Sequence, residues 1–120
     1  MKIAISSKGE TLESTLDKRF GRCKYFLIKD TDTNEVEVIK NEGVKSESGA
    51  AITATQQIID RKVDVVITGN LGPNAFHLID KADIKAYKSD EIVIQDALDR
   101  FNDGKLPEIK KAGPASHGGF

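Results

Sequence analysis

The residue types best suited to chemistry lie close together in one short segment, from Arg19 to Cys23. Cys23 is the only cysteine among 120 residues, so one chain can form neither an internal disulfide nor a four-cysteine metal site. A thiolate binds iron and other soft metals, and the nearby Arg19 and Arg22 would lower the thiol pKa. The alternative is that a lone cysteine is only a small buried apolar side chain, which is the commoner case when nothing else is known.

The two histidines are weaker candidates for a site. His77 falls on the side of a predicted helix opposite to its apolar stripe, so we expect it to be exposed and not to bind metal. His117 lies between small residues near the end of the chain. We expect it to belong to a flexible tail over residues 107–120, from which it could fold over a site.

A second candidate site is the turn after the apolar run Val63–Ile67. Gly69 and Gly72 flank Asn70 in this turn, and Pro73 is expected to begin a helix. A strand that leads into a glycine-rich turn and a helix is a common frame for ligand sites in α/β proteins. The spacing matches neither G-x-G-x-x-G nor G-x-x-x-x-G-K-[ST], which excludes the known phosphate loops. A tight turn without a ligand is an equally good interpretation.

The hydrophobic periodicity predicts the elements that must position these residues. Predicted strands span residues 2–6, 24–29, 35–40, 63–67 and 84–87, and predicted helices span 49–61, begin at 73, and span 91–101. Ser48 is expected to cap the first helix. The inward stripes are expected to be Ile52, Thr55, Ile58 and Ile59 in the first helix, Ala75, Leu78, Ile79 and Ala82 in the second, and Ile94, Ala97, Leu98 and Phe101 in the third.

This order of elements predicts an α/β domain with three α/β/α layers, the ribonuclease H-like layout. Its five-stranded mixed sheet would have the order 3-2-1-4-5 with strand 2 antiparallel and strand 3 at the edge. Strands one, three, four and five then end at one edge of the sheet. The loops 7–22, 41–48, 68–72 and 88–90 meet there with two helix N-termini, whose free N–H groups favour an anion. We expect one domain over residues 1–106.

Composition and missing residues exclude several classes of protein. The net charge of −1 gives no reason to expect nucleic acid as a partner, and no apolar run is long enough to span a membrane. The N-terminus passes directly into a strand pattern, so we expect a cytoplasmic protein. A two-metal nuclease of this fold needs a carboxylate on its first strand, and residues 2–6 contain none. No nucleophile–base pair can be placed at the loop edge either, so we do not expect an enzyme.

Five stretches of the chain keep a recognisable motif order and spacing: Arg19–Phe26, Ser48–Ala51, Val63–Phe76, Ile84–Tyr87 and Gly104–Leu106. Together they resemble the dinitrogenase iron–molybdenum cofactor biosynthesis proteins, the NifX-like family, and this chain is similar to its small stand-alone members. The resemblance implies a ribonuclease H-like domain. It also implies a non-enzymatic carrier or chaperone of iron–sulfur or iron–molybdenum clusters, with cluster-assembly proteins as partners.

We therefore expect a transiently bound anionic cluster at the loop edge, with Cys23 as its direct metal ligand and a monomer or weak homodimer as the carrier. Two other interpretations remain open: a protein-interaction or regulatory module for cluster assembly, and a sensor of small anions or nucleotides. The expected cofactor-binding residues are Cys23, Arg19, Arg22, Gly21, Ser48, Gly49, Gly69, Asn70, Gly72 and Asn74.

Overall fold

A computed structural model describes the fold of residues 1–45 and 49–113. Within these two ranges, five strands and three α-helices follow one another in the predicted order. The strands are β1 (Lys2–Ser7), β2 (Tyr25–Asp30), β3 (Val36–Lys40), β4 (Val65–Thr68) and β5 (Lys85–Lys88). The helices are α1 (Ala50–Asp60), α2 (Pro73–Lys81) and α3 (Ile94–Asn102), and two short 3₁₀ helices are η1 (Phe20–Arg22) and η2 (Glu42–Lys45).

The sheet has the order β3-β2-β1-β4-β5, as the sequence predicts. β1 pairs antiparallel with β2 and parallel with β4, while β3 and β5 pair with the outer sides of β2 and β4. All four residues of β4 are buried, because helices cover both faces of the sheet at this strand. The mixed α/β architecture is therefore confirmed, with β2 as the reversed strand.

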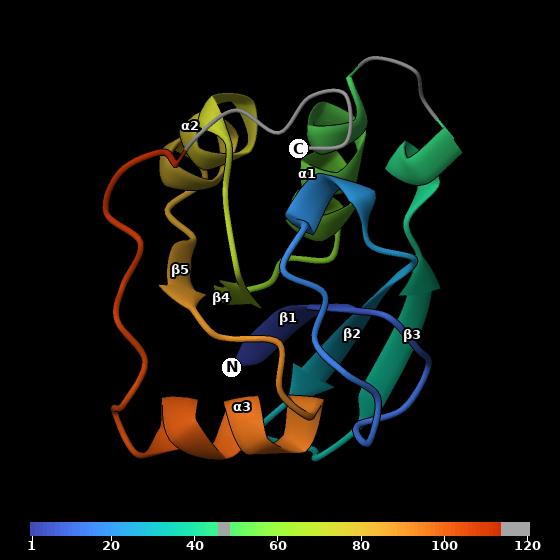
Figure 1. The fold of residues 1–120 in the computed structure, drawn as a ribbon, viewed down its shortest axis with the longest axis vertical. Coiled ribbons are helices and arrows are strands. Elements are labelled where there is room, and N and C mark those ends of the chain that lie inside the picture. Colours follow the sequence, from blue (N-terminus) through green and yellow to red (C-terminus); the bar gives the residue numbers. More distant parts are fainter. Residues whose placement is uncertain (46–48, 114–120) are drawn as a thin grey trace.

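The helices lie in two layers, with α1 and α2 on one face of the sheet and α3 on the other (Figure 1). Alternate residues of the central strand face the two layers. Ala4 packs in the core cluster on the α1/α2 side, whereas Ile3 and Ile5 pack in the cluster on the α3 side. The two clusters hold the ends of the strands, and so the loops that follow them, in place.

The predicted inward stripe of α1 is wrong at Ile52, which is 48% exposed. The prediction is confirmed at Thr55 and Ile58, which are buried, and Ala50 and Ala54 are buried beside them. Residues four apart lie on one side of a helix, and small alanines let α1 approach η1 and the sheet closely. In α2 the prediction fails at Ala82, which is exposed because the helix ends at Lys81. The stripe of α3 is confirmed, with Phe101 partly buried.

Two predicted boundaries shift, and at the first of them a neighbouring segment uses a backbone group that the longer helix would need. α3 begins at Ile94 and not at Glu91, since the carbonyl of Ile92 accepts a hydrogen bond of 2.8 Å from the N–H of Leu16. β4 begins at Val65 and not at Val63. Differences of this size at element ends come from tertiary contacts that periodicity does not contain.

Residues 105–113 form a strap that runs along β5 from the α3 layer to the α2 layer (Figure 1). Two backbone hydrogen bonds, of 2.8 and 2.9 Å, join the strap to β5. This differs from the flexible tail that the sequence predicts from residue 107, because the free edge of β5 offers backbone partners to the returning chain. The rest of the predicted tail, with His117, lies outside the described residues.

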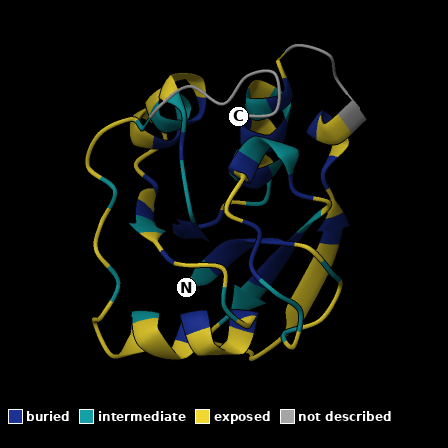
Figure 2. Ribbon diagram, viewed as in Figure 1, coloured by how far each residue is buried: buried dark blue, intermediate teal, exposed yellow. Residues whose placement is uncertain are grey.

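The opposite edge of the sheet is more open, as Figure 2 shows by the exposed residues of β3. Val36 and Val38 are 37% and 39% exposed, whereas Ile39 faces α1 and is buried. This confirms β3 as an edge strand. In the part of the chain that the structure describes, no helix combines the length and apolarity that crossing a membrane requires.

Candidate functional site

The structure brings the two chemically distinctive segments of the sequence side by side at the loop edge. Arg19 forms a parallel bridge with Asn70, so the long loop after β1 runs next to the turn after β4. The next residues of that loop form η1, which packs against α1. Residues about fifty positions apart therefore share one surface, which agrees with the convergence predicted from the strand order.

A glycine is needed at position 69 because Lys18 lies very close to its Cα, and not because of the backbone angles of Gly69. A Cβ atom at this position would overlap the Cβ of Lys18 and would lie 2.7 Å from its Cα. Gly21 has a milder requirement of the same kind, with 3.2 Å between its ideal Cβ and the Cα of Ala51. Both glycines let the long loop lie directly on its neighbours, the turn after β4 and the first turn of α1.

Two helix N-termini open at this edge, and within the described residues neither has a side-chain cap. Gly49, with a left-handed φ of 74°, precedes α1, and Gly72 precedes Pro73 at the start of α2. Neither glycine offers a side chain to the first N–H groups of its helix. Ser48, the predicted cap of α1, lies outside the described residues, and Asn74 is exposed.

The N-terminus of α3 is different. The N–H of Ile94 donates to the carbonyl of Ser14 and the N–H of Gln95 to the carbonyl of Leu12, both at 2.9 Å. The first part of the long loop thus supplies hydrogen-bond acceptors to the first N–H groups of α3. Within the described residues, no comparable backbone or side-chain contact closes the N-termini of α1 and α2, so these two helix ends are where an anion could bind.

Arg19 is held in one orientation by Asp17. The guanidinium Nε and Nη2 donate to the two carboxylate oxygens of Asp17, each at 3.2 Å, and the backbone N–H of Arg19 donates to Oδ1 at 2.9 Å. The Asp17 side chain is 3% exposed, whereas that of Arg19 is 50% exposed. The hydrogen bonds and charge of Asp17 raise the pKa of Arg19. The pair leaves part of a fixed guanidinium facing solvent beside Asn70.

We expect the variant Asp17→Ala to lose about 1–3 kcal/mol of unfolding free energy, because three donors of Arg19 lose a buried acceptor. Chemical denaturation measures this loss. Asp32→Ala is the matched control, since Asp32 also accepts an ion pair, at 3.1 Å, but its side chain is 82% exposed. The control is expected to change the stability by less than about 0.5 kcal/mol. Equal losses in the two variants would contradict the role of Asp17.

Cys23 does not have the environment that the sequence predicts for a metal ligand. Its side chain is fully buried, with an exposed fraction of 0%, and its thiol donates to the carbonyl of Phe20 at 3.4 Å. Burial raises the thiol pKa to about 12, although the backbone amide of Ser7 and the side chain of Asn41 act in the opposite direction. The predicted lowering of the pKa is therefore wrong, and Cys23 is the small buried apolar residue of the alternative interpretation.

Asn41 is a site-forming residue that the sequence analysis missed. It is 2% exposed, and its Nδ2 donates to the carbonyls of Gly21 and Cys23 at 3.1 and 2.9 Å. Its Oδ1 accepts the N–H of Gly43 at 2.9 Å. Asn41 thus ties η1 to η2 beside α1. The sequence did contain a signal for this role, because Asn41 directly follows a predicted strand. A buried loop at such a position needs a side chain that both donates and accepts hydrogen bonds, as an asparagine amide does.

The structure also places Arg22 and His77, the other two side chains that the sequence analysis considered. Arg22 is half-buried in η1, and His77 is exposed on α2, as expected. Among the described residues, no three histidine, cysteine, aspartate or glutamate side chains are grouped so that they could hold a metal ion. Within the described ranges, the loop edge presents two helix N-termini and the guanidinium groups of Arg19 and Arg22.

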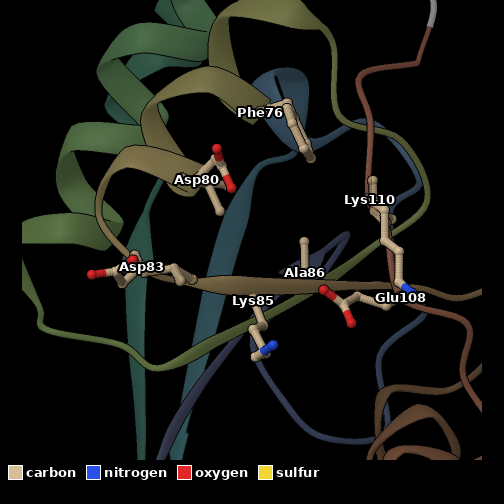
Figure 3. Close-up of a pocket in the computed structure, with 10 residues that line it drawn as sticks. Phe76, Asp80, Asp83, Lys85, Ala86, Glu108 and Lys110 are labelled. Atoms are coloured by element: carbon tan, nitrogen blue, oxygen red, sulfur yellow. The ribbon is translucent and has the colours of Figure 1, made fainter.

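A pocket of about 280 Å³ lies elsewhere, between α2, the start of β5 and the strap. Figure 3 shows Phe76 and Asp80 reaching toward it from α2, with Glu108 and Lys110 on the strap side. Its charged residues are all exposed. Because the loop edge lies at the other end of β5, this pocket is separate from the candidate site.

Comparison with protein families settles the affiliation of the chain. Residues 1–104 match the family described as dinitrogenase iron-molybdenum cofactor. The chain belongs to this family. The family is one of cofactor biosynthesis and binding, which agrees with the resemblance carried by the motifs.

Three proteins are similar to this chain in sequence, and two of them also have a similar fold. The orange protein of Desulfovibrio gigas, solved in its apo form, is 32% identical, with a TM-score of 0.89 over 93% of this chain and 95% of its own. A Thermotoga protein described as a NifB candidate of the DUF35 family is 33% identical, with a TM-score of 0.83 over 93% and 96%. An uncharacterized protein of Methanocaldococcus jannaschii is 28% identical over 113 residues, which are 92% of each chain.

Proposed function

We propose that this protein is a non-enzymatic carrier that transiently binds an anionic iron–sulfur or iron–molybdenum cluster at the loop edge. Membership of a cofactor family supplies the class of cargo. The observation that carries the proposal is the pair of N-termini of α1 and α2, which have no side-chain cap from the described residues and open near Arg19 and Arg22. Free N–H groups, two helix dipoles and guanidinium groups together favour a multiply charged anion.

The mode of binding follows from the donors that are present. The buried Cys23 offers no thiolate, and the described residues contain no group that could hold a metal ion. We therefore infer that the cluster is bound through its outer sulfides and oxygens. Backbone N–H groups at Gly49, Gly69 and Gly72 would donate to these atoms, and Arg19 would add a charge-assisted hydrogen bond. If no protein atom is bonded to the metal, the cluster can be transferred to another protein without breaking a protein–metal bond.

Exposed apolar side chains support a docking role for the same edge. Ile52 in the first turn of α1 is 48% exposed and Val44 in η2 is 41% exposed. A cluster-assembly protein that delivers or receives the cargo would contact both of them and cover the site during transfer. If the protein never binds a cluster, the same side chains favour the second candidate, an interaction module for cluster assembly.

The proposal is tested by anaerobic reconstitution with iron, molybdate and sulfide, followed by desalting and measurement of bound metal and charge-transfer absorbance. Wild type is expected to retain metal. The double variant Arg19→Ala/Arg22→Ala is expected to retain it at least about tenfold less tightly, because each charge-assisted hydrogen bond contributes about 1.5–3 kcal/mol. Lys81→Ala/Lys85→Ala removes the same charge at a distance and is the control.

Three results would contradict parts of this proposal. If wild type retains no metal above a non-binding protein, the carrier function is wrong. If the lysine control loses as much metal as the arginine variant, binding depends on net charge and not on the loop edge. If Cys23→Ala alone abolishes retention, the cluster is bound by direct ligation.

A further inference from the structure

The strap, residues 105–113, ends on the turn of the candidate site. The N–H of Gly113 donates to the carbonyl of Leu71 at 2.8 Å. A Cβ at position 113 would overlap the side-chain Oδ1 of Asn70, so the strap lies directly on that side chain. The turn is thus contacted from two sides, by Arg19 of the long loop and by Gly113 of the strap.

Upstream of Gly113, the strap is attached at a few separate points. The N–H of Ile109 donates to the carbonyl of Ala86 at 2.8 Å, and the N–H of Lys88 donates to the carbonyl of Pro107 at 2.9 Å. Ile109 also packs against the core cluster on the α1/α2 side. These contacts join the strap to β5 in the manner of an added antiparallel edge segment.

Apart from Leu106 and Ile109, which pack against the two core clusters, the strap is loosely packed. None of residues 105–113 is buried, and the pocket of about 280 Å³ separates Glu108 and Lys110 from α2 (Figure 3). The segment also lies beyond residue 104, where the match to the family ends. Few buried contacts and exposed hydrogen bonds are the properties of segments that open locally without global unfolding.

From these contacts we infer that the strap is a detachable clamp on the 69–72 turn, and that its attachment is coupled to the loop edge. The attached strap holds Asn70 and Leu71 between Gly113 and the long loop. Release of the strap at Ile109 frees Gly113 and loosens the turn. This inference rests on the proposed function only for the ligand: a cluster that binds the N–H groups of the turn would favour the attached strap, because coupling between two sites is reciprocal.

Hydrogen exchange measured by mass spectrometry tests the clamp in the full chain without any ligand. Ile109→Ala is expected to speed exchange at least about tenfold in peptides covering both 105–113 and 69–72, while β1 stays protected. Gly113→Val, which clashes with Asn70, is expected to speed exchange in the turn. Lys111→Ala changes an exposed strap residue and is the control. Faster exchange confined to the strap in Ile109→Ala would overturn the inference.

The reconstituted protein separates this inference from the proposed function. If wild type binds the cluster and exchange in 105–113 slows at least about tenfold, the coupling is supported. If the cluster binds and exchange in the strap is unchanged, the coupling is wrong and the carrier function stands. If no cluster binds, the carrier function fails, and the comparison of Ile109→Ala with Lys111→Ala decides the clamp by itself.

Discussion

Replacing Gly69 with alanine is expected to destabilise the protein by about 1–3 kcal/mol and to weaken cluster retention at least about tenfold. The added Cβ would overlap the Cβ of Lys18 and lie 2.7 Å from its Cα, so backbone must move. The movement separates the long loop from the turn and breaks the bridge between Arg19 and Asn70. Thermal or chemical denaturation measures the first effect, and metal retention after anaerobic reconstitution measures the second.

Gly104→Ala is the matched control for this experiment. Gly104 has a φ of 70° and nothing within 4 Å of an ideal Cβ, so alanine there costs about 1 kcal/mol of backbone strain and causes no clash. It lies after α3, away from the loop edge. The control should lose stability but keep its metal. The double variant Lys18→Gly/Gly69→Ala lacks the Cβ of Lys18 that causes the overlap. It should therefore recover part of the stability and part of the metal retention that Gly69→Ala loses. Undiminished retention in Gly69→Ala would show that the junction is not part of the site.

The stability of the wild-type protein is expected to fall with rising pH above about 9, because of Cys23. In the unfolded chain the thiol ionises near its ordinary pKa of 9.0, whereas in the folded protein burial keeps it protonated up to about 12. Between these values the unfolded state has released a proton that the folded state still binds. The free energy of unfolding therefore falls by about 1.4 kcal/mol for each pH unit in this window. The contribution of Cys23 to stability is fully present only below pH 9.

Denaturation midpoints of wild type and Cys23→Ala at pH 8 and at about pH 10.5 measure this effect. Tyrosines and lysines titrate in both proteins, so the informative quantity is the difference between them. Wild type is expected to lose about 2 kcal/mol more than the variant over this interval. The same raised pKa makes the thiolate roughly a thousandfold scarcer than in a free thiol, so native Cys23 should resist alkylation at pH 8. Equal pH dependence in both proteins would mean that the thiol is accessible.

The corrected position of Cys23 changes how cargo selectivity is explained. An exposed thiolate would select soft metals by direct bonding. An edge made of N–H groups and guanidinium groups selects by charge and shape, and it releases its ligand more easily. If the protein is the carrier proposed above, its retention of the cluster is expected to fall as the salt concentration rises, since partly exposed charge interactions are screened.

The sequence alone determined the order of the sheet, because local hydrophobic periodicity and chain order leave few topologies. It also determined that the loop after β1 and the turn after β4 meet, since the exits of parallel strands share an edge. The glycines of that turn were visible for the same reason: Gly69 and Gly72 interrupt an otherwise regular strand–helix pattern. The family resemblance carried by the motifs agreed with the match over residues 1–104.

What the side chains at that edge can do depends on packing that the sequence pattern does not contain. The burial of Cys23 depends on Phe20, Asn41 and the end of β1, which sequence spacing does not place around it. The orientation of Arg19 likewise depends on a buried Asp17. Burial and pKa are properties of everything packed around an atom, and most of those neighbours come from distant parts of the chain. Periodicity predicts which elements form, and packing decides which of their groups reach solvent as a donor or a ligand.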